Sequence, residues 1–329
     1  MCLWSSKGGM KEMNIKNQIT KQNITDFMKK YGIFLAFLIL FLVMGVLRPA
    51  TFLTAGNQRN ILRQISINGI MATGMTFVII TGGIDLSVGS VLAYSSIVAC
   101  SFARPGEYPL MISIVVALSI GAALGAFNGV VIAKGKVPPF IVTLGMLTIA
   151  RGLTQLFNGG RPINNLSAEY NFIGGGSVIG IPVPVIILGV VILLGYFLLN
   201  KTRFGRYVYA VGGNKATAKV SGIQVDRIYI MVYTLMGALA ALSGIVLSAR
   251  VETATVIAGT GYELDAIAAV TIGGTSSAGG KGTIIGTVIG VLIMGVLSNG
   301  LDLLGVSSYY QQIVKGFIII GAVLLDKKK

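Results

Sequence analysis

The chain has 329 residues, of which 54% are hydrophobic and 11% are charged, whereas about 25% of residues are charged in an ordinary soluble domain. A soluble protein of this composition would expose large apolar patches, so the composition excludes a soluble globular protein and predicts a helical membrane protein. The net charge of +15 does not indicate nucleic acid as a partner, because lysines and arginines gather in the cytosolic loops of membrane proteins.

The composition also limits the chemistry that this chain can perform. It contains no histidine, which removes histidine-based proton relays. Its two cysteines, Cys2 and Cys100, are too few for a Cys₄ zinc site or a disulfide framework. We therefore expect no metal ion and no cofactor bound by this chain.

Apolar segments that could cross a membrane recur along the chain, and a span needs about 20 residues. The predicted spans are 31–47, 60–81, 91–102, 110–133, 138–157, 183–199, 228–249, 262–272, 283–298 and 309–325. The sequence therefore predicts an all-α, polytopic helical membrane protein with about ten transmembrane helices, some of them short and broken. Residues 31–325 form one transmembrane domain between a basic tail at 1–30 and a short tail at 326–329. The first span lacks a small-residue cleavage pattern, so we expect it to be retained.

The distribution of cations orients this topology. Eighteen lysines and arginines fall in segments that the topology places in the cytosol, six fall in external segments, and Arg151 and Lys315 fall inside spans. Because cytosolic loops carry the excess of positive charge, both termini are predicted to be cytosolic. The longest cytosolic segment is 200–227, where six cations accompany one acid, Asp226.

Glycines at four-residue spacing mark two predicted helix faces. The first set is Gly121, Gly125 and Gly129, and the second is Gly282, Gly286 and Gly290. Residues four apart lie on the same side of a helix, and small residues let the backbones of neighbouring helices approach closely. We therefore expect tight helix packing at both sets.

The segment 273–283, GGTSSAGGKGT, approaches a phosphate-binding loop without matching it. In the phosphate-binding pattern G-x-x-x-x-G-K-[ST], Thr275 occupies the position of the first glycine and Gly282 occupies the position of the final serine or threonine. We therefore expect this chain not to bind ATP. Its glycines are expected to allow a broken helix and a close approach of the backbone instead.

Asp85 and Ser87 interrupt hydrophobic sequence in TGGIDLSVGS at 81–90. An acid inside a span is costly, so it is either functional or held by partners. One interpretation is structural, with either side chain capping the helix that follows. The alternative is contact with a transported substrate, because broken helices with free polar ends often line transport sites.

Four further polar side chains are candidates for a pathway or gate. Glu263 and Asp265 open the predicted span 262–272, where acids would complement the helix dipole or face a substrate cavity. Asn68 and Thr271 are neutral and are expected to bond across helices or to line the pathway. Paired carboxylates also occur in glycosidases, but nothing in this sequence predicts a soluble active-site cleft.

Three blocks of sequence carry a family likeness. They are GMTFVIITGGIDLSVGSVLA at 74–93, GRYVYAVGGNKATAKVSGI at 205–223, and the run 259–290, which is followed by NGLDLLGVSSYYQQIVKG. Together these blocks resemble the ribose-type permease subunits of bacterial ABC importers, and the likeness extends from about residue 31 to the end of the chain. The first 30 residues carry no such signal.

The resemblance implies an assembly in the bacterial inner membrane, surrounded by its lipids. A second permease copy would complete a homodimer, a cytosolic ATPase would use ATP and Mg, and an external protein would deliver the sugar. A coupling helix is implied to dock into the ATPase. The matching residues are Gly212, Gly213, Asn214, Lys215, Ala216, Ala218, Lys219, Ser221 and Gly222.

The coupling stretch also has suitable physical properties. Small residues such as Ala216 and Ala218 permit close docking, and Lys215 and Lys219 are four apart, so they share a helix face. Gly213 and Gly222 are helix breakers at its two ends. A merely solvated loop is the alternative interpretation of the same residues.

We therefore expect the membrane-spanning subunit of an ATP-driven monosaccharide importer, with ribose as the sugar and no catalysis by this chain. Galactose, xylose, autoinducer-like sugars and nucleosides are alternative substrates within the same family. The alternative from another class is an ion-coupled transporter. That function would need a titratable relay or a cation site inside the membrane, which the composition does not favour.

Overall fold

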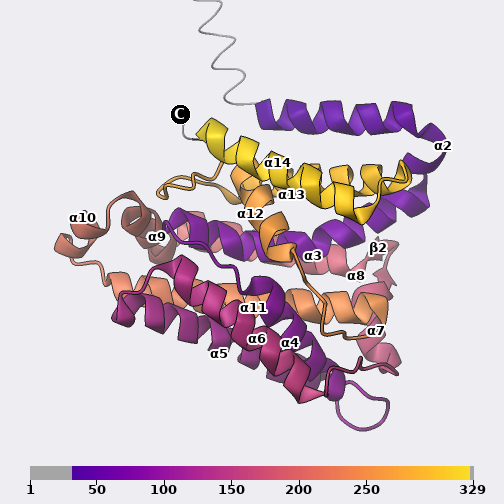
Figure 1. Ribbon diagram of the computed structural model, residues 1–329, viewed down its shortest axis with the longest axis horizontal. Coiled ribbons are helices and arrows are strands. Elements are labelled where there is room, and N and C mark those ends of the chain that lie inside the picture. The colour runs from indigo at the N-terminus through magenta and orange to yellow at the C-terminus, as the bar shows by residue number, and fades with distance from the viewer. Residues whose placement is uncertain (1–31, 327–329) are drawn as a thin grey trace, which may run out of the picture.

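The protein is described by a computed structural model that covers residues 32–326, a bundle of helices with a small two-stranded hairpin (Figure 1). Its elements are the helix Gly32–Leu47, α2 (Pro49–Phe52), α3 (Ala55–Ile80), α4 (Val88–Ser101), α5 (Leu110–Gly135), α6 (Pro139–Phe157), α7 (Ala168–Gly175), β1 (Ser177–Val178), β2 (Ile181–Pro182), α8 (Val183–Lys201), α9 (Arg203–Gly213), α10 (Lys215–Val220), α11 (Val225–Val251), α12 (Tyr262–Ile272), α13 (Ile284–Leu303) and α14 (Ser308–Asp326). The predicted tail at 1–30 lies outside these residues, and so does the predicted tail at 326–329 apart from Asp326, which is the last residue of α14.

Each predicted span coincides with a helix, and most boundaries agree within a few residues. Within the described residues, five helices have the length and the hydropathy needed to cross a bilayer, namely α5, α6, α8, α11 and α13. A helical membrane protein is therefore confirmed, whereas the number of spans and the side of each terminus stay predictions.

The segment 158–182 holds more structure than the external loop that its composition predicts. Ser167 begins α7, where its side chain accepts a hydrogen bond from the Tyr170 amide at 3.3 Å. A hairpin follows in which Val178 pairs with Ile181. The two turn residues, Ile179 and Gly180, have φ angles of +52° and +78°, which suits the twist of a tight hairpin.

Close helix packing is confirmed at the first glycine set. On α5, Gly121 and Gly125 lie against the backbone of Gly237 on α11, and a Cβ at Gly129 would lie only 2.6 Å from the Ile230 Cα. A methyl group at any of these positions would separate the two helices. Glycine at every fourth residue therefore positions α11 against α5.

The second glycine set is confirmed only in part. Gly286 and Gly290 on α13 lie against the carbonyl groups of Gly273 and Ala269 at the end of α12. Gly282 does not share this face, because α13 begins at Ile284 and Gly282 lies in the connector before it. A Cβ there would meet the Thr275 side chain at 2.6 Å.

The helices α4 and α12 are short, as predicted for broken spans. α4 has 14 residues and α12 has 11, and at about 1.5 Å per residue neither crosses a hydrocarbon core of about 30 Å. Their first turns meet, because Gly89 on α4 lies against the Gly259 carbonyl that precedes α12. The chain therefore changes direction inside the bundle at two neighbouring places.

Candidate functional site

The predicted coupling stretch, 212–222, contains the last two residues of α9 and the whole of α10, and one residue separates these helices. Asn214 adopts an extended backbone with φ −161° and ψ 110°, so it ends α9 and begins α10. Its side chain accepts a hydrogen bond from the Thr217 amide at 3.0 Å, which caps α10. Ser221 follows α10, and Gly222 has a φ of +82°, where glycine carries no steric penalty. Asn214 and Gly222 therefore delimit α10.

The short helix α10 has an inner and an outer face. Ala218 is 3% exposed and packs into the chain's own core, so it cannot contact a partner. Ala216 is exposed, and Val220 is 91% exposed. Val220 therefore lies on the outer face, where it is available to contact another protein. Of the two predicted docking alanines, only Ala216 lies on the open face, and Val220 was missed by the sequence interpretation.

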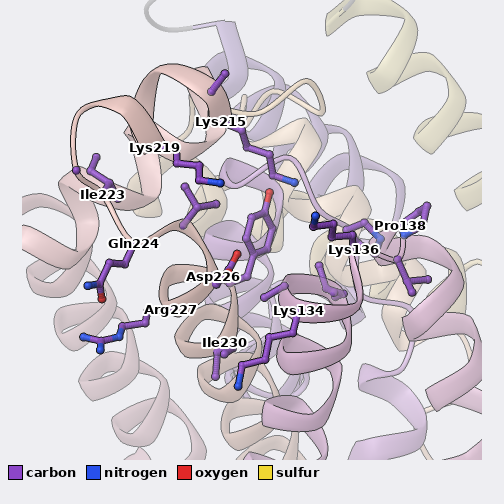
Figure 2. Close-up of a pocket in the computed structure, with 18 residues that line it drawn as sticks. Lys134, Lys136, Pro138, Lys215, Lys219, Ile223, Gln224, Asp226, Arg227 and Ile230 are labelled. Atoms are coloured by element: carbon purple, nitrogen blue, oxygen red, sulfur yellow. The ribbon is translucent and has the colours of Figure 1, made fainter.

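The predicted pair Lys215 and Lys219 borders a groove of about 1010 Å³, into which both side chains extend from α10 (Figure 2). Lys134 and Lys136 at the end of α5 lie on the opposite wall. The Lys215 ammonium lies 4.4 Å from the centroid of the Tyr229 ring, a distance suited to cation–π attraction. Ion pairs found in the described residues lie elsewhere, so the groove keeps a net positive lining.

The first residue of the coupling stretch, Gly212, contacts the backbone at two places where helical structure is interrupted. We call these the interrupted segments: the one that follows α3 and the connector between α12 and α13. Gly212 lies against the Ile80 carbonyl at the end of α3 and against Gly280 in the connector between α12 and α13. The Gly280 amide donates to that same carbonyl at 2.8 Å. A side chain at Gly212 would push all three segments apart. The connector's glycines thus allow the close backbone approach that the sequence predicts.

Two tyrosines strengthen this junction. The Tyr209 hydroxyl on α9 donates to the Gly282 carbonyl at 2.7 Å. Burial raises the pKa of Tyr209, so the phenol stays protonated as a donor. The Tyr229 hydroxyl on α11 donates to the Thr81 carbonyl at 2.9 Å. Neither tyrosine was singled out from sequence, because a tyrosine near a membrane interface is common.

Asp85 is 2% exposed and is held within its own segment. One of its oxygens accepts hydrogen bonds from the Ser87 amide at 2.9 Å and the Ser87 hydroxyl at 2.6 Å. Asn128 on α5 donates to the same hydroxyl at 3.1 Å. The predicted side-chain cap on α4 is not formed. Ser87 precedes α4 and makes no side-chain cap bond to it, and Asp85 accepts its hydrogen bonds from Ser87. The cluster ties the start of α4 to α5.

Asp265 forms an ion pair that its sequence context did not predict. Its carboxylate lies 2.9 Å from the Lys315 ammonium of α14, and the two side chains are 11% and 22% exposed. The partner could have been sought among the few cations inside predicted spans, because buried charges are paired. Asp265 therefore joins α12 to α14 rather than standing as a free acid.

Glu263 and Arg151 occupy the region where α4 and α12 begin. The Glu263 carboxylate accepts from the Gly261 amide at 3.3 Å and lies beside Gly89. The Arg151 guanidinium on α6 donates to the carbonyls of Val256 and Ala258, the latter at 3.0 Å. Arg151 thus anchors the segment that leads into α12, which a cation inside a span could have indicated.

The remaining pathway candidates are not brought together with these groups. Thr271 donates to the Ile267 carbonyl of its own helix at 2.8 Å. The Asn68 side-chain oxygen is buried and accepts no hydrogen bond from the described residues. The structure therefore separates the six candidates into the Asp85–Ser87 cluster, the Asp265–Lys315 pair, Glu263 near Arg151, and two separate neutral side chains.

Comparison with known proteins adds to this geometry. Residues 57–323 match the family described as branched-chain amino acid transport system / permease component. The chain is 52% identical over 299 residues to the ribose import permease protein RbsC of Escherichia coli K12, covering 90% of this chain and 92% of that protein. It is 49% identical to the Bacillus subtilis RbsC, with coverage of 97% and 99%. The D-allose transport system permease protein AlsC of Escherichia coli is 42% identical, with coverage of 93% and 94%.

No solved structure matches the chain. The family match spans most of the chain, including both interrupted segments and the coupling stretch. The helical membrane fold described above agrees with this match. The chain therefore belongs to the branched-chain amino acid transport system / permease component family, and it is a multi-pass inner-membrane transport subunit rather than an enzyme.

Proposed function

We propose that this chain is the permease subunit of an ATP-driven importer and that its substrate is ribose. The observation that carries the sugar assignment is the 52% identity to the Escherichia coli ribose import permease over nearly the whole length of both chains. The Bacillus subtilis ribose import permease is similar to a comparable extent. Likeness to the D-allose permease is lower, so D-allose is the second candidate.

The assembly that we propose contains two copies of this chain, a cytosolic ATPase that uses ATP and Mg, and an external sugar-binding protein. Each copy has about ten spans with both termini in the cytosol, a topology supported by the excess of cations in the segments that it places there. The substrate is delivered by the binding protein. This chain supplies the passage and performs no chemistry.

In this proposal, ATP binding closes the ATPase subunits and displaces α10, the coupling helix. The exposed Val220 and the positively lined groove at Lys215 support α10 as the docking element. The contact of Gly212 with Ile80 and Gly280 supplies a direct mechanical connection to α3 and to the connector before α13. The permease then changes between two conformations that open on opposite sides of the membrane.

The test is reconstitution of this chain with its ATPase in liposomes, with the sugar-binding protein and labelled sugar on one side. We expect ribose uptake that requires both ATP and the binding protein. Accumulation of D-allose with exclusion of ribose would replace the substrate assignment. Uptake by this chain alone on a proton or sodium gradient would replace the importer mechanism with an ion-coupled one.

A further inference from the structure

A cavity of about 280 Å³ lies at the end of α11 that is remote from the coupling stretch, between α4, α11 and the segment that leads into α12. None of the residues that line it is charged, and more than half of them carry a hydroxyl group. The hydroxyl residues are Ser96, Ser248, Thr253, Thr255, Thr260 and Tyr262. Its size approaches the roughly 300 Å³ at which sites for small molecules begin.

Five of these hydroxyl groups are of two kinds: three already donate their hydrogen to the protein, and two make no hydrogen bond within the described residues. Ser96, Thr253 and Thr260 each donate to a backbone carbonyl, at 2.8, 3.2 and 2.8 Å respectively. Each of these oxygens therefore keeps lone pairs with which it can accept a hydrogen bond from a ligand. The hydroxyls of Thr255 and Tyr262 make no hydrogen bond within the described residues, so they can both donate and accept.

The rest of the lining is apolar and supplies a surface for carbon–hydrogen groups. It includes Leu247, Val251 and Ile257, together with the ring of Tyr262. Val251 and Ile257 are exposed, which places them at the mouth of the cavity. A lining with convergent hydroxyls and apolar surface but without charge fits a neutral polyhydroxylated ligand. The lining residues themselves offer no counter-ion to a phosphate or to an amino-acid zwitterion, and the charges of Arg250 and Asp265 act on the Tyr262 phenol from outside the lining.

The cavity wall is held in place by contacts from three other parts of the chain. The Arg151 guanidinium binds the carbonyls of Val256 and Ala258 from α6. Ile163 and Ala254 exchange two backbone hydrogen bonds of 3.0 Å each. Ser248 on the opposite wall hydrogen-bonds Tyr170 of α7 at 2.8 Å. The hydroxyl groups are therefore positioned before any ligand arrives, which lowers the cost of binding.

We propose that this cavity, between Thr255 and Tyr262, is a transit site that binds the neutral monosaccharide on the side of the permease facing the binding protein. The inference rests on the proposed function and adds a location and a set of contacts to it. The sugar's hydroxyl groups bond to the serine and threonine oxygens, and its carbon–hydrogen face lies on the Tyr262 ring.

The first experiment removes the two free hydroxyls in the reconstituted complex through Thr255→Val and Tyr262→Phe. Because each change deletes a hydrogen bond to the substrate, we expect ribose uptake to fall about three- to tenfold for each variant. ATP hydrolysis stimulated by the loaded binding protein should stay within about twofold, since coupling is unaffected. The control is Thr234→Val on α11, whose hydroxyl bonds the Ile230 carbonyl of its own helix; its uptake should be unchanged. Normal uptake by both cavity variants would overturn the proposal.

The second experiment detects sugar in the cavity without relying on transport. Thr255→Cys is introduced into a Cys2→Ser, Cys100→Ala background and labelled with a membrane-impermeant maleimide. We expect millimolar ribose to slow labelling at least about threefold and valine at the same concentration to have no effect. Equal labelling with and without ribose would overturn the site even if the wild-type complex transports ribose. Absence of ATP-driven uptake by the wild-type complex would instead refute the proposed function, and protection by ribose would still establish the site.

Discussion

The ion pair between Asp265 and Lys315 should stabilise the attachment of α14 to α12. With 2.9 Å between the charged atoms and side chains that are 11% and 22% exposed, the pair is largely removed from solvent. Removing one partner of a fully buried pair costs about 3–5 kcal/mol, because the other charge stays unpaired. The partial exposure allows some solvation of that charge, so we expect about 2–3 kcal/mol from Lys315→Met or Asp265→Leu alone.

The double variant separates the ion pair from the packing of the two side chains. When both charges are removed, neither is left unpaired, so most of the lost stability should return. We expect a coupling free energy of about 1.5–3 kcal/mol between the two positions. Two independent packing effects would instead add, and such additivity would refute the role that we assign to the ion pair.

A buried thiol already present in the chain provides the assay. Cys100 is fully buried and free, so a fluorogenic maleimide reacts with it only when the surrounding helices open. Heating the purified protein in detergent, in a Cys2→Ser background, then reports the midpoint of unfolding for the parent, both single variants and the double variant. A single variant as stable as the parent would show that the pair contributes nothing measurable.

Three further predictions concern the coupling stretch and the interrupted segments. Gly212→Val should abolish coupled uptake while ATP hydrolysis continues, because its side chain would overlap the Ile80 carbonyl; uptake per ATP within twofold of the parent would contradict this. Val220→Asp should leave the unfolding midpoint unchanged, because the side chain is 91% exposed, but should reduce co-purification of the ATPase at least about tenfold; undiminished co-purification would remove Val220 from the interface. Asp85→Ala should destabilise the protein by about 1–3 kcal/mol, since two buried donors of Ser87 lose their acceptor, and Asp85→Asn should recover most of that loss in the same thermal assay.

The features that could be predicted from the sequence are those with a repeating or compositional signal. Long apolar runs located the helices, and glycines at every fourth residue predicted that α5 packs closely against a neighbouring helix, which the structure identifies as α11. The coupling stretch was delimited through the family likeness, but the helix break falls at Asn214 and not at the predicted Gly213, which is the last residue of α9. Each of these features depends on residues that are close together in the chain, so one sequence contains the pattern that predicts it.

Features that depend on residues far apart in the chain could not be predicted. Asp265 and Lys315 are separated by 50 residues, and Arg151 reaches carbonyl groups more than 100 residues away. Each charge could be noticed alone as an unusual residue within a span, but its partner depends on how helices pack. The inward direction of Ala218 and the outward direction of Val220 likewise depend on where α10 rests against the bundle.

The coupling stretch contacts the membrane domain in two physically different ways. At Gly212 the contact is between backbones, and backbones in contact cannot absorb a displacement by changing a rotamer. Movement of α9 toward the bundle must therefore move Ile80 or Gly280 as well.

At Tyr229, by contrast, one ring lies under the Lys215 ammonium while its hydroxyl holds the Thr81 carbonyl. These contacts reach Ile80, the last residue of α3, and Thr81, the first residue after it; the segment that follows contains Asp85, whose side chain bonds only Ser87 among the described residues. In the mechanism that we propose, a displacement of α10 would reach this segment and, through the contact of Gly89 with Gly259, the start of α12.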